Sequence, residues 1–270
     1  VRAIEAVAKL PAYREKVLSW APENARFSFG PLGAFMGYDF HLGDNGPKLI
    51  EVNTNAGGAF LNAFLAKAQL ACCSEMKVAS DRSGGADFKT AILHMFKAEF
   101  SLQRGADAIA RMAIVDDRPE EQYLYPEFLL AQRFFEKNGI EAAIVDAADL
   151  RYEGDRLQAD GSPVDLVYNR LTDFSFEFPE HAALKAAYLR ESAVVTPNPF
   201  IHALFADKRN LALLTDAATV RSWVLPADVM AGLENIPHTV MVDADNADRL
   251  WAERRNLFFN LSTKMLQIFN

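Results

Sequence analysis

Residues 34–58 read AFMGYDFHLGDNGPKLIEVNTNAGG, and this stretch decides the expected fold. Apolar or aromatic residues occupy every second position through AFMGYDFHL, which is the pattern of a β-strand. The sequence GDNGP that follows has the residues of a tight turn, and it leads into a second strand, KLIEVN. We therefore predict a β-hairpin over residues 34–53. A glycine-bearing loop comes next, and residues 59–73, AFLNAFLAKAQLACC, have the alanine and leucine content of a largely buried helix.

The second strand of this hairpin carries a carboxylate and an amide two residues apart. Glu51 and Asn53 project from the same face of the strand, which also carries Leu49, whereas Ile50 and Val52 occupy the other face. Carboxylate and amide oxygens are ligands for a hard cation, so the pair is a candidate Mg²⁺ site. The plainer alternative is an exposed polar strand face, which is the ordinary situation for such residues.

Two neighbouring features favour the metal interpretation. The loop that contains Gly57 and Gly58 leads into the start of a helix, an arrangement that offers backbone N–H groups to an anion. The first strand ends in Asp39 and His41. Whether Asp39 shares a face with Glu51 depends on the register of the hairpin, because a slip of one residue separates them.

The rest of the chain alternates between strand and helix patterns. Residues 1–20 show helical spacing that is broken or restarted at Pro11. From about residue 108 the elements succeed one another in the order β-α-β-hairpin-β-α-β, which argues for a mainly parallel sheet covered by helices. The expected elements are strands over 109–116, 141–146, 164–170 and 193–198, helices over 126–138 and 179–191, and a small hairpin over 151–161.

Composition excludes several classes of function. The net charge is −8, with 28 Lys and Arg against 36 Asp and Glu and no long basic cluster, so nucleic-acid binding is not expected. No stretch of about 18 uncharged apolar residues is present, and we expect no membrane span. The two cysteines, Cys72 and Cys73, are adjacent in a helical pattern and cannot readily form a disulfide. We therefore expect a cytoplasmic protein.

Familiar catalytic motifs are also missing from the sequence. It contains neither the G-x-x-x-x-G-K-[ST] phosphate loop, nor the G-x-G-x-x-G fingerprint, nor the G-x-S-x-G elbow of serine hydrolases. The five histidines never fall in a metal-ligand spacing such as H-x-x-x-H, and we interpret them as structural. Tyr123 and Tyr125 stand at core-like spacing.

The segments GYDFHL and GPKLIEVNTNAGG resemble the circularly permuted ATP-grasp enzymes, the group that contains eukaryotic-type glutathione synthetases and glutathionylspermidine synthetases. The sequence is most similar to a bacterial branch of that group. The resemblance continues through VDLVYNR, residues 164–170, and through SAVVTPNPFIHALFADKRNLALL, residues 192–214. It covers roughly residues 34–259.

This resemblance implies roles for individual residues. Glu51 and Asn53 would be magnesium ligands, and Asp39 a polar group near the acceptor. Arg170 would anchor a substrate carboxylate or the transferring phosphate, and Lys208 would contact an ATP phosphate. The loop residues on the nucleotide side would be Asn55, Gly57 and Gly58.

Two of these residues have ordinary alternatives. Arg170 carries a planar guanidinium suited to carboxylate or phosphate, but a surface arginine paired with Asp173 explains its position equally well. Lys208 follows Asp207, which can serve as the N-cap of the NLALL helix, and its alternative is an ordinary surface lysine in a first helical turn.

The resemblance implies an α/β fold, ATP-grasp-like, with an inserted and mainly parallel β-α-β domain on the substrate side. We expect residues 1–107 to form the N-terminal part of the ATP-grasp-like lobe with the metal-binding hairpin. Residues 108–200 would form the substrate-side domain, and residues 201–270 the start of an incomplete ATP-binding lobe. The implied activity is that of an ATP-dependent carboxylate–amine ligase that acts through an acyl phosphate, with small carboxylate and amine substrates, ATP and Mg²⁺.

The resemblance breaks down near the end of the sequence. Asn260 stands where the family has a second lysine, and the tail NLSTKMLQIFN has no glycine and does not resemble the family's lid. A truncated gene, an altered frame near codon 260 and a piece of a longer protein all fit this observation. We therefore expect the chain not to be a competent ligase by itself, and the segment after about Asn256 to be poorly packed for lack of pairing partners. The alternative function is a non-catalytic module that binds a small molecule or peptide.

Overall fold

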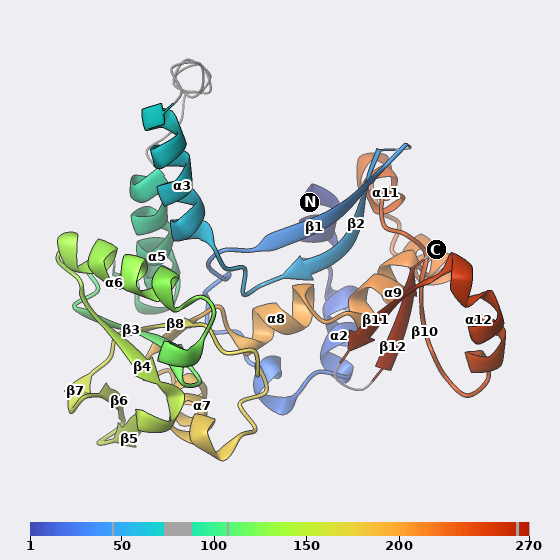
Figure 1. Cartoon of the computed structure of the whole chain (residues 1–270). Coiled ribbons are helices and arrows are strands. Elements are labelled where there is room, and N and C mark those ends of the chain that lie inside the picture. Colours follow the sequence, from blue (N-terminus) through green and yellow to red (C-terminus); the bar gives the residue numbers. More distant parts are fainter. Residues whose placement is uncertain (45, 73–87, 107, 263–264, 270) are drawn as a thin grey trace. The chain divides into compact units, whose positions relative to one another are not determined.

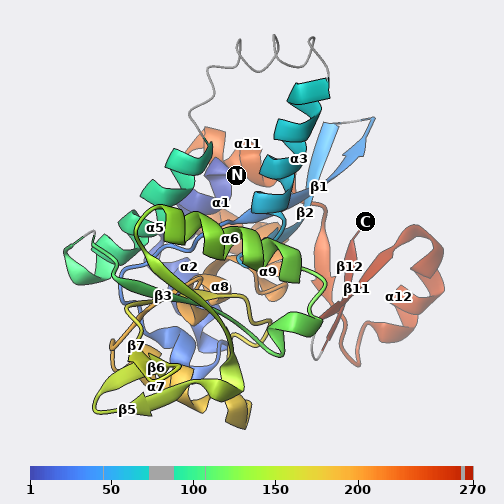
Figure 2. The same cartoon turned by 60° about the vertical axis from the view of Figure 1, so that its left-hand side comes forward.

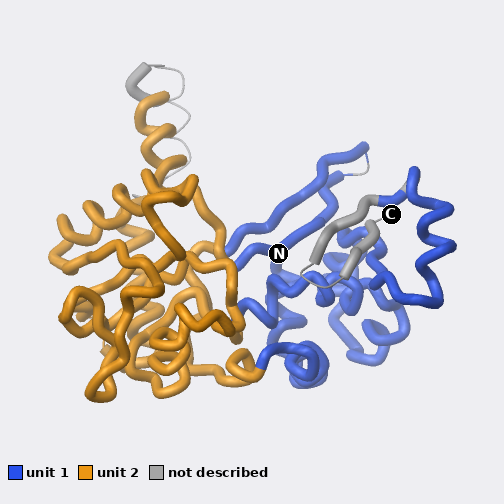
Figure 3. Tube along the Cα trace, turned by 60° about the horizontal axis from the view of Figure 1, so that its bottom comes forward, with its two compact units in different colours: residues 1–22, 36–54, 201–270 blue, residues 23–35, 55–200 orange. Residues whose placement is uncertain are grey.

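A computed structural model describes residues 1–44, 46–72, 88–106, 108–262 and 265–269 (Figures 1 and 2). The chain forms two compact units, shown in blue and orange in Figure 3. Unit 1 comprises residues 1–22, 36–54 and 201–270, and unit 2 comprises residues 23–35 and 55–200. This division differs from the expected one, because residues 55–107 belong with the parallel sheet of unit 2 rather than with the hairpin.

Unit 2 is built on a four-stranded parallel sheet with the strand order β4-β3-β8-β9. Its sheet strands are β3 (Arg111–Asp116), β4 (Glu141–Asp146), β8 (Leu166–Asn169) and β9 (Val194–Thr196). Its helices are α3 (Ala59–Cys72), α5 (Phe88–Arg104), α6 (Tyr125–Lys137) and α7 (Ala182–Leu189). A small antiparallel sheet contains β5 (Arg151–Glu153), β6 (Arg156–Ala159) and β7 (Ser162–Pro163). The predicted order of elements and the predicted parallel sheet are confirmed.

Both faces of the parallel sheet are buried. Met112 and Ile114 of β3 belong to a core cluster that also contains Phe128 of α6. Val115 of the same strand belongs to a second cluster, which contains Leu184 of α7. Alternate residues of one strand therefore pack into opposite layers, which is why the strands read as nearly continuous apolar runs. Figures 1 and 2 show α5 and α6 on one side of the sheet, and α7 with the β5–β7 sheet on the other.

Unit 1 contains the hairpin, a set of short helices and a second antiparallel sheet. The hairpin strands are β1 (Gly37–Gly43) and β2 (Gly46–Asn53). The helices are α1 (Arg2–Val7), α2 (Pro11–Ser19), most of α8 (Pro199–Phe205), α9 (Arg209–Thr215), α10 (Ala217–Ser222), α11 (Ala227–Leu233) and α12 (Ala247–Glu253). The helix break before Pro11 is confirmed, with the proline at the first position of α2.

The hairpin contains a β-bulge that the sequence analysis did not foresee. Asp39 pairs with Glu51, but the next pair along the strands skips Ile50, so that Ile50 has no cross-strand partner. The extra residue places Leu49 on the same face as Val52, and both are buried, at 3% and 4% exposure. The prediction that Leu49 shares the face of Glu51 was therefore wrong.

The strands near the end of the sequence are paired. β11 (Phe258–Ser262) and β12 (Met265–Phe269) are antiparallel neighbours, and β12 also pairs with β10 (Thr239–Met241). Asn260 lies opposite Gln267 in this register. The expectation that the segment after about Asn256 lacks pairing partners was wrong, because residues 239–241 and 265–269 supply them.

Two expectations of burial also fail. The first turn of α3 packs inward through Phe60, but from Asn62 onward the helix is largely exposed, with Phe64 at 64% and Leu65 at 53%. Tyr123 precedes α6 and is 95% exposed, so its core-like spacing was misleading. The expectation for the cysteine pair lies partly outside the described residues, since the structure describes Cys72 but not Cys73.

No helix in the described parts of the chain combines the length and the apolar character that a membrane span requires.

Candidate functional site

The hairpin of unit 1 gathers three of the predicted site residues on one face. Asp39 on β1 lies directly opposite Glu51 on β2, which answers the question of register. The amide Nδ2 of Asn53 donates a hydrogen bond to Asp39 Oδ2 over 3.1 Å. Because the nitrogen of this amide faces Asp39, its oxygen Oδ1 remains an acceptor that a cation or donor can use.

A fourth predicted residue reaches the same cluster from a distant part of the sequence. Lys208 immediately precedes α9, and its Nζ lies 3.2 Å from Glu51 Oε1. The start of this helix is fixed by Asp207, whose Oδ1 accepts the backbone N–H of Arg209 over 2.9 Å. The side chains of Lys208 and Glu51 are 23% and 28% exposed, so neither is an ordinary surface residue.

The residue that follows Asn53 is anchored by a buried histidine. Thr54 is 1% exposed, and its Oγ1 lies 3.2 Å from Nδ1 of His202 on α8. Burial lowers the pKa of His202 to about 4, against the opposing influence of Asp207. The imidazole is therefore neutral at pH 7, and the Thr54 contact is a neutral hydrogen bond that fixes the end of β2.

The donors on this face fit Mg²⁺ in their chemistry. Glu51, Asp39 and Asn53 all present oxygen atoms, which are the ligands that magnesium prefers. Among the described residues, no three His, Cys, Asp or Glu side chains gather as a metal site. A magnesium ion held here would take one or two carboxylates from the protein and complete its shell with water and phosphate oxygens, as is usual for nucleotide-bound magnesium.

In unit 2, Arg170 is a buried residue at the end of β8. It is 6% exposed, and its guanidinium donates hydrogen bonds to the carbonyl oxygens of Ala56 over 3.2 Å and Asn55 over 3.3 Å. Asn55 Nδ2 returns two bonds to the carbonyls of residues 170 and 171, at 2.8 and 2.9 Å. The alternative of a surface pair with Asp173 is wrong, because Asp173 instead accepts hydrogen bonds from Ser175.

The predicted glycine loop lies against this arginine. A side chain at Gly57 would collide with Leu124 Cδ1 unless that side chain moved, and it would approach Arg170 Nη2 to 3.1 Å. Gly58 has a φ of +87°, a conformation that glycine adopts without strain. The N–H groups of Gly57 and Gly58 donate no hydrogen bond to any residue that the structure describes. Both therefore remain available at the start of α3.

Comparison with solved structures bears on the fold. The chain superposes on a glutathione synthetase-like effector from Globodera pallida, solved in its apo form, with a TM-score of 0.58 and 16% identity. The match covers 100% of this chain and 69% of that one. The fold is glutathione synthetase-like. The sequence itself matches no protein-family model and no curated protein.

A second solved structure is more distant. It is a protein named as a gamma-glutamylcysteine synthetase from Methylobacillus flagellatus, with a TM-score of 0.46, 12% identity, and coverage of 94% of this chain and 59% of that one.

Within this glutathione synthetase-like fold, Glu127 is a polar residue that the sequence analysis missed. It lies in the first turn of α6 and is 2% exposed, and neither of its carboxylate oxygens has a hydrogen-bond partner among the residues that the structure describes. The position of a side chain added to Gly58 would lie 3.9 Å from Glu127 Oε2, so the carboxylate borders the glycine loop. No motif marked it, because a glutamate near the start of a helix is ordinary. Only its burial singles it out.

A second polar group lies at the carboxyl edge of the parallel sheet, where ligands bind in open α/β folds. His181 is 1% exposed and lies between Asp117, at 2.8 Å from Nε2, and Asp173, at 3.0 Å from Nδ1. Beside it, burial raises the pKa of Asp116 to about 6, with Arg170 opposing the shift. The interpretation of all five histidines as structural did not predict that His181 lies between two carboxylates.

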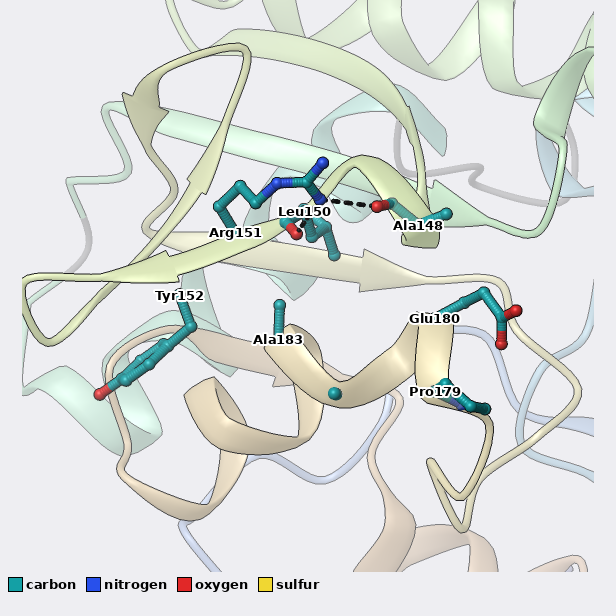
Figure 4. Close-up of a pocket in the computed structure, with 8 residues that line it drawn as sticks. Ala148, Leu150, Arg151, Tyr152, Pro179, Glu180 and Ala183 are labelled. Atoms are coloured by element: carbon teal, nitrogen blue, oxygen red, sulfur yellow. Dashed lines mark hydrogen bonds between the residues drawn. The ribbon is translucent and has the colours of Figure 1, made fainter.

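A cavity of about 580 Å³ lies beside the β5–β6 hairpin and the start of α7 (Figure 4). The Arg151 guanidinium is turned toward Ala148 and Leu150 and donates to their carbonyls over 2.7 and 2.9 Å. None of the predicted site residues lines it. Arg151 already donates hydrogen bonds to two backbone carbonyls, and we therefore do not include this cavity in the candidate site.

Proposed function

We propose that this chain binds Mg²⁺–ATP through its hairpin unit and acts in the ATP-dependent joining of a carboxylate to an amine. In such a reaction the γ-phosphoryl group moves from ATP to the substrate carboxylate, and the amine then displaces phosphate from the acyl phosphate. The observation that carries the proposal is the convergence of Lys208 on Glu51, with Asp39 and Asn53 on the same face. The glutathione synthetase-like fold supports it.

The hairpin cluster has the charges that phosphoryl transfer requires. Glu51 and Asn53 supply oxygens for the metal, and Lys208 supplies a positive charge for a phosphate. In the structure Lys208 neutralises Glu51. We propose that magnesium takes over this neutralisation when nucleotide binds, so that the lysine turns to the phosphates. Bound magnesium would supply electrostatic stabilisation of the charge that develops on the transferring phosphoryl group.

Two side chains of unit 2 are proposed to contact substrate, and one is cationic and the other acidic. Arg170 carries the guanidinium suited to a carboxylate, although in the structure it also holds the loop carbonyls. Glu127 carries a buried carboxylate with no partner among the described residues, a state that costs several kcal/mol unless a donor compensates it. We propose that Glu127 receives the ammonium group of an amine-bearing substrate.

The proposal is tested by phosphate release from ATP, measured with and without Mg²⁺ across a panel of small carboxylates and amines. We expect release that depends on magnesium and on one carboxylate–amine pair, and that falls in Glu51→Ala. Absence of turnover with every pair, together with absence of nucleotide binding, would contradict the proposed function.

One observation favours a binding module without catalysis. Asn260 lies on β11 opposite Gln267, at the position where the resemblance calls for a second lysine. A thermal-shift titration separates the two candidates, because a ligand that binds only the folded state raises the melting temperature. Stabilisation by a small carboxylate but not by Mg²⁺–ATP would favour the binding module.

A further inference from the structure

A cavity of about 500 Å³ lies in unit 2 among α3, α5 and α6, outside the residues assigned above. Figures 1 and 2 both show these three helices on the same side of the parallel sheet. A volume of this size suits a small organic molecule. The apolar side chains that form most of its wall include Phe60, Phe64, Phe88, Ile92, Leu130 and Phe134.

The floor of the cavity is packed and its mouth is apolar. Phe60 and Ile92 are buried at 7% and 3%, and the rings of Phe60 and Phe134 lie 5.6 Å apart. By contrast Phe64 and Phe88 at the opening are 64% and 42% exposed. Exposed phenylalanines next to buried apolar residues form a continuous apolar surface, which is typical of a binding site and not of a core.

The charged residues that line this cavity, among those the structure describes, are all basic. They are Lys67, Lys89, Arg133 and Lys137. Lys67, Arg133 and Lys137 form no ion pair with any carboxylate among the described residues. The chain as a whole carries a net charge of −8, so this group of four basic side chains is locally positive on a protein that is negative overall.

We infer that this cavity binds a small amphipathic carboxylate, with its apolar body against the phenylalanines and its anionic group among the basic side chains. The apolar floor does not suit a polyanion such as a nucleotide, and the cationic rim does not suit an amine. The site is separate from the residues proposed for ligase chemistry. Its occupant is therefore an additional ligand, and the inference does not depend on the proposed function.

The experiment is a calorimetric titration of the chain with decanoate, and in parallel with decyltrimethylammonium, both below their critical micelle concentrations. The two probes share an apolar tail and differ in charge. We expect a single decanoate per chain and affinity for the cation at least about tenfold weaker, since the rim attracts one head group and repels the other. Equal affinities, or no decanoate binding, would overturn the inference.

Two pairs of variants localise the site. The double charge reversal Arg133→Glu with Lys137→Glu should weaken decanoate binding about tenfold, because two attractions become repulsions. The charge-matched control Lys9→Glu with Arg156→Glu, at exposed positions outside the cavity, should change it by less than about twofold. Equal losses in the two doubles would show that only net charge matters and would overturn the assignment.

The apolar contact is tested in the same way. Phe64→Ser removes an exposed ring from the opening and should weaken decanoate binding, whereas Tyr123→Ser removes a ring that is 95% exposed and lies outside the cavity. Because both side chains are exposed, both variants are expected to retain the fold, which circular dichroism checks. Undiminished affinity in Phe64→Ser would place the ligand elsewhere.

Discussion

Lys208 Nζ lies 3.2 Å from Glu51 Oε1, and this ion pair ties the segment before α9 to the hairpin strand β2. Its two members are far apart in the sequence, and the fold alone brings them together. Both side chains are partly shielded from water, so each charge stabilises the other. The hairpin also carries Asp39 and Asn53 within the same hydrogen-bonded face.

Glu51→Ala should weaken Mg²⁺–nucleotide binding by about tenfold or more, because it removes a charged oxygen ligand from the metal. Glu15→Ala, on the exposed side of α2, is the matched control and should leave the affinity unchanged. Calorimetric titration measures both. If Glu51→Ala binds as tightly as the wild type, Glu51 is a structural partner of Lys208 and not a metal ligand.

Arg170→Met should lower the free energy of unfolding by about 2–4 kcal/mol, since it leaves the carbonyls of Asn55 and Ala56 without their buried donor. Arg156→Met, at an exposed position on β6, is the control and should stay within about 0.5 kcal/mol of the wild type. Chemical denaturation provides the comparison. A loss in Arg170→Met no larger than in the control would show that Arg170 does not hold this loop.

Glu127→Gln should raise stability at pH 7 by about 1–2 kcal/mol, because the amide has nearly the same shape and replaces a buried carboxylate that has no partner among the described residues. The same change should abolish selection for an amine-bearing substrate. Glu136→Gln, an exposed position on the same helix, serves as control. A marked loss of stability in Glu127→Gln would mean that the carboxylate has a structural partner and is not kept for a ligand.

The neutral state of His202 predicts a pH dependence of stability. Burial lowers its pKa from an ordinary value of 6.5 to about 4. Between these values the unfolded chain binds a proton that the folded chain does not, so the contribution of His202 is complete above pH 6.5 and is lost as the pH falls toward 4. Because of this linkage, His202 alone should make the free energy of unfolding about 2 kcal/mol lower at pH 5 than at pH 7.

Denaturation of the wild type and of His202→Gln at pH 7 and pH 5 isolates that contribution, because the other titrating groups are common to both. We expect the smaller pH effect in His202→Gln, even though the variant is less stable at pH 7. The same pH effect in both proteins would show that His202 titrates normally in the folded state.

Much of the fold could be predicted from the sequence because its signals are local. The parallel sheet of unit 2 could be predicted from the apolar runs around Ile114 and Val167, because each run is bounded by turn or helix signals. The hairpin could be predicted from the alternation of apolar and polar residues around Asp39 and from the turn-forming residues that follow. The predictions that were wrong concerned features that depend on tertiary structure. The bulge at Ile50, the exposure of Phe64 on α3 and the pairing of β12 are set by neighbours that no local pattern specifies.

The candidate site divides in the same way. Glu51 and Asn53 could be proposed because their spacing on a strand fixes a common face. The contact of Lys208 with Glu51 could not be derived from spacing, and only resemblance had linked the two residues. Glu127 was missed altogether, because its distinguishing property is burial without a partner, which becomes visible only in three dimensions.

The central claim is that Glu51, Asn53 and Lys208 act together on magnesium and nucleotide, and calorimetric titration with ATP in the presence and absence of Mg²⁺ tests it most directly. Lys208→Met is compared with Lys48→Met. In the wild type the Lys48 ammonium group donates an exposed hydrogen bond to the carbonyl of Glu234 in the same unit. We expect magnesium-dependent ATP binding that falls about tenfold or more in Lys208→Met, with the loss of one charge-assisted contact, and is unchanged in Lys48→Met. ATP binding that is indifferent both to magnesium and to Lys208→Met, or that is absent from the wild type, would contradict the account.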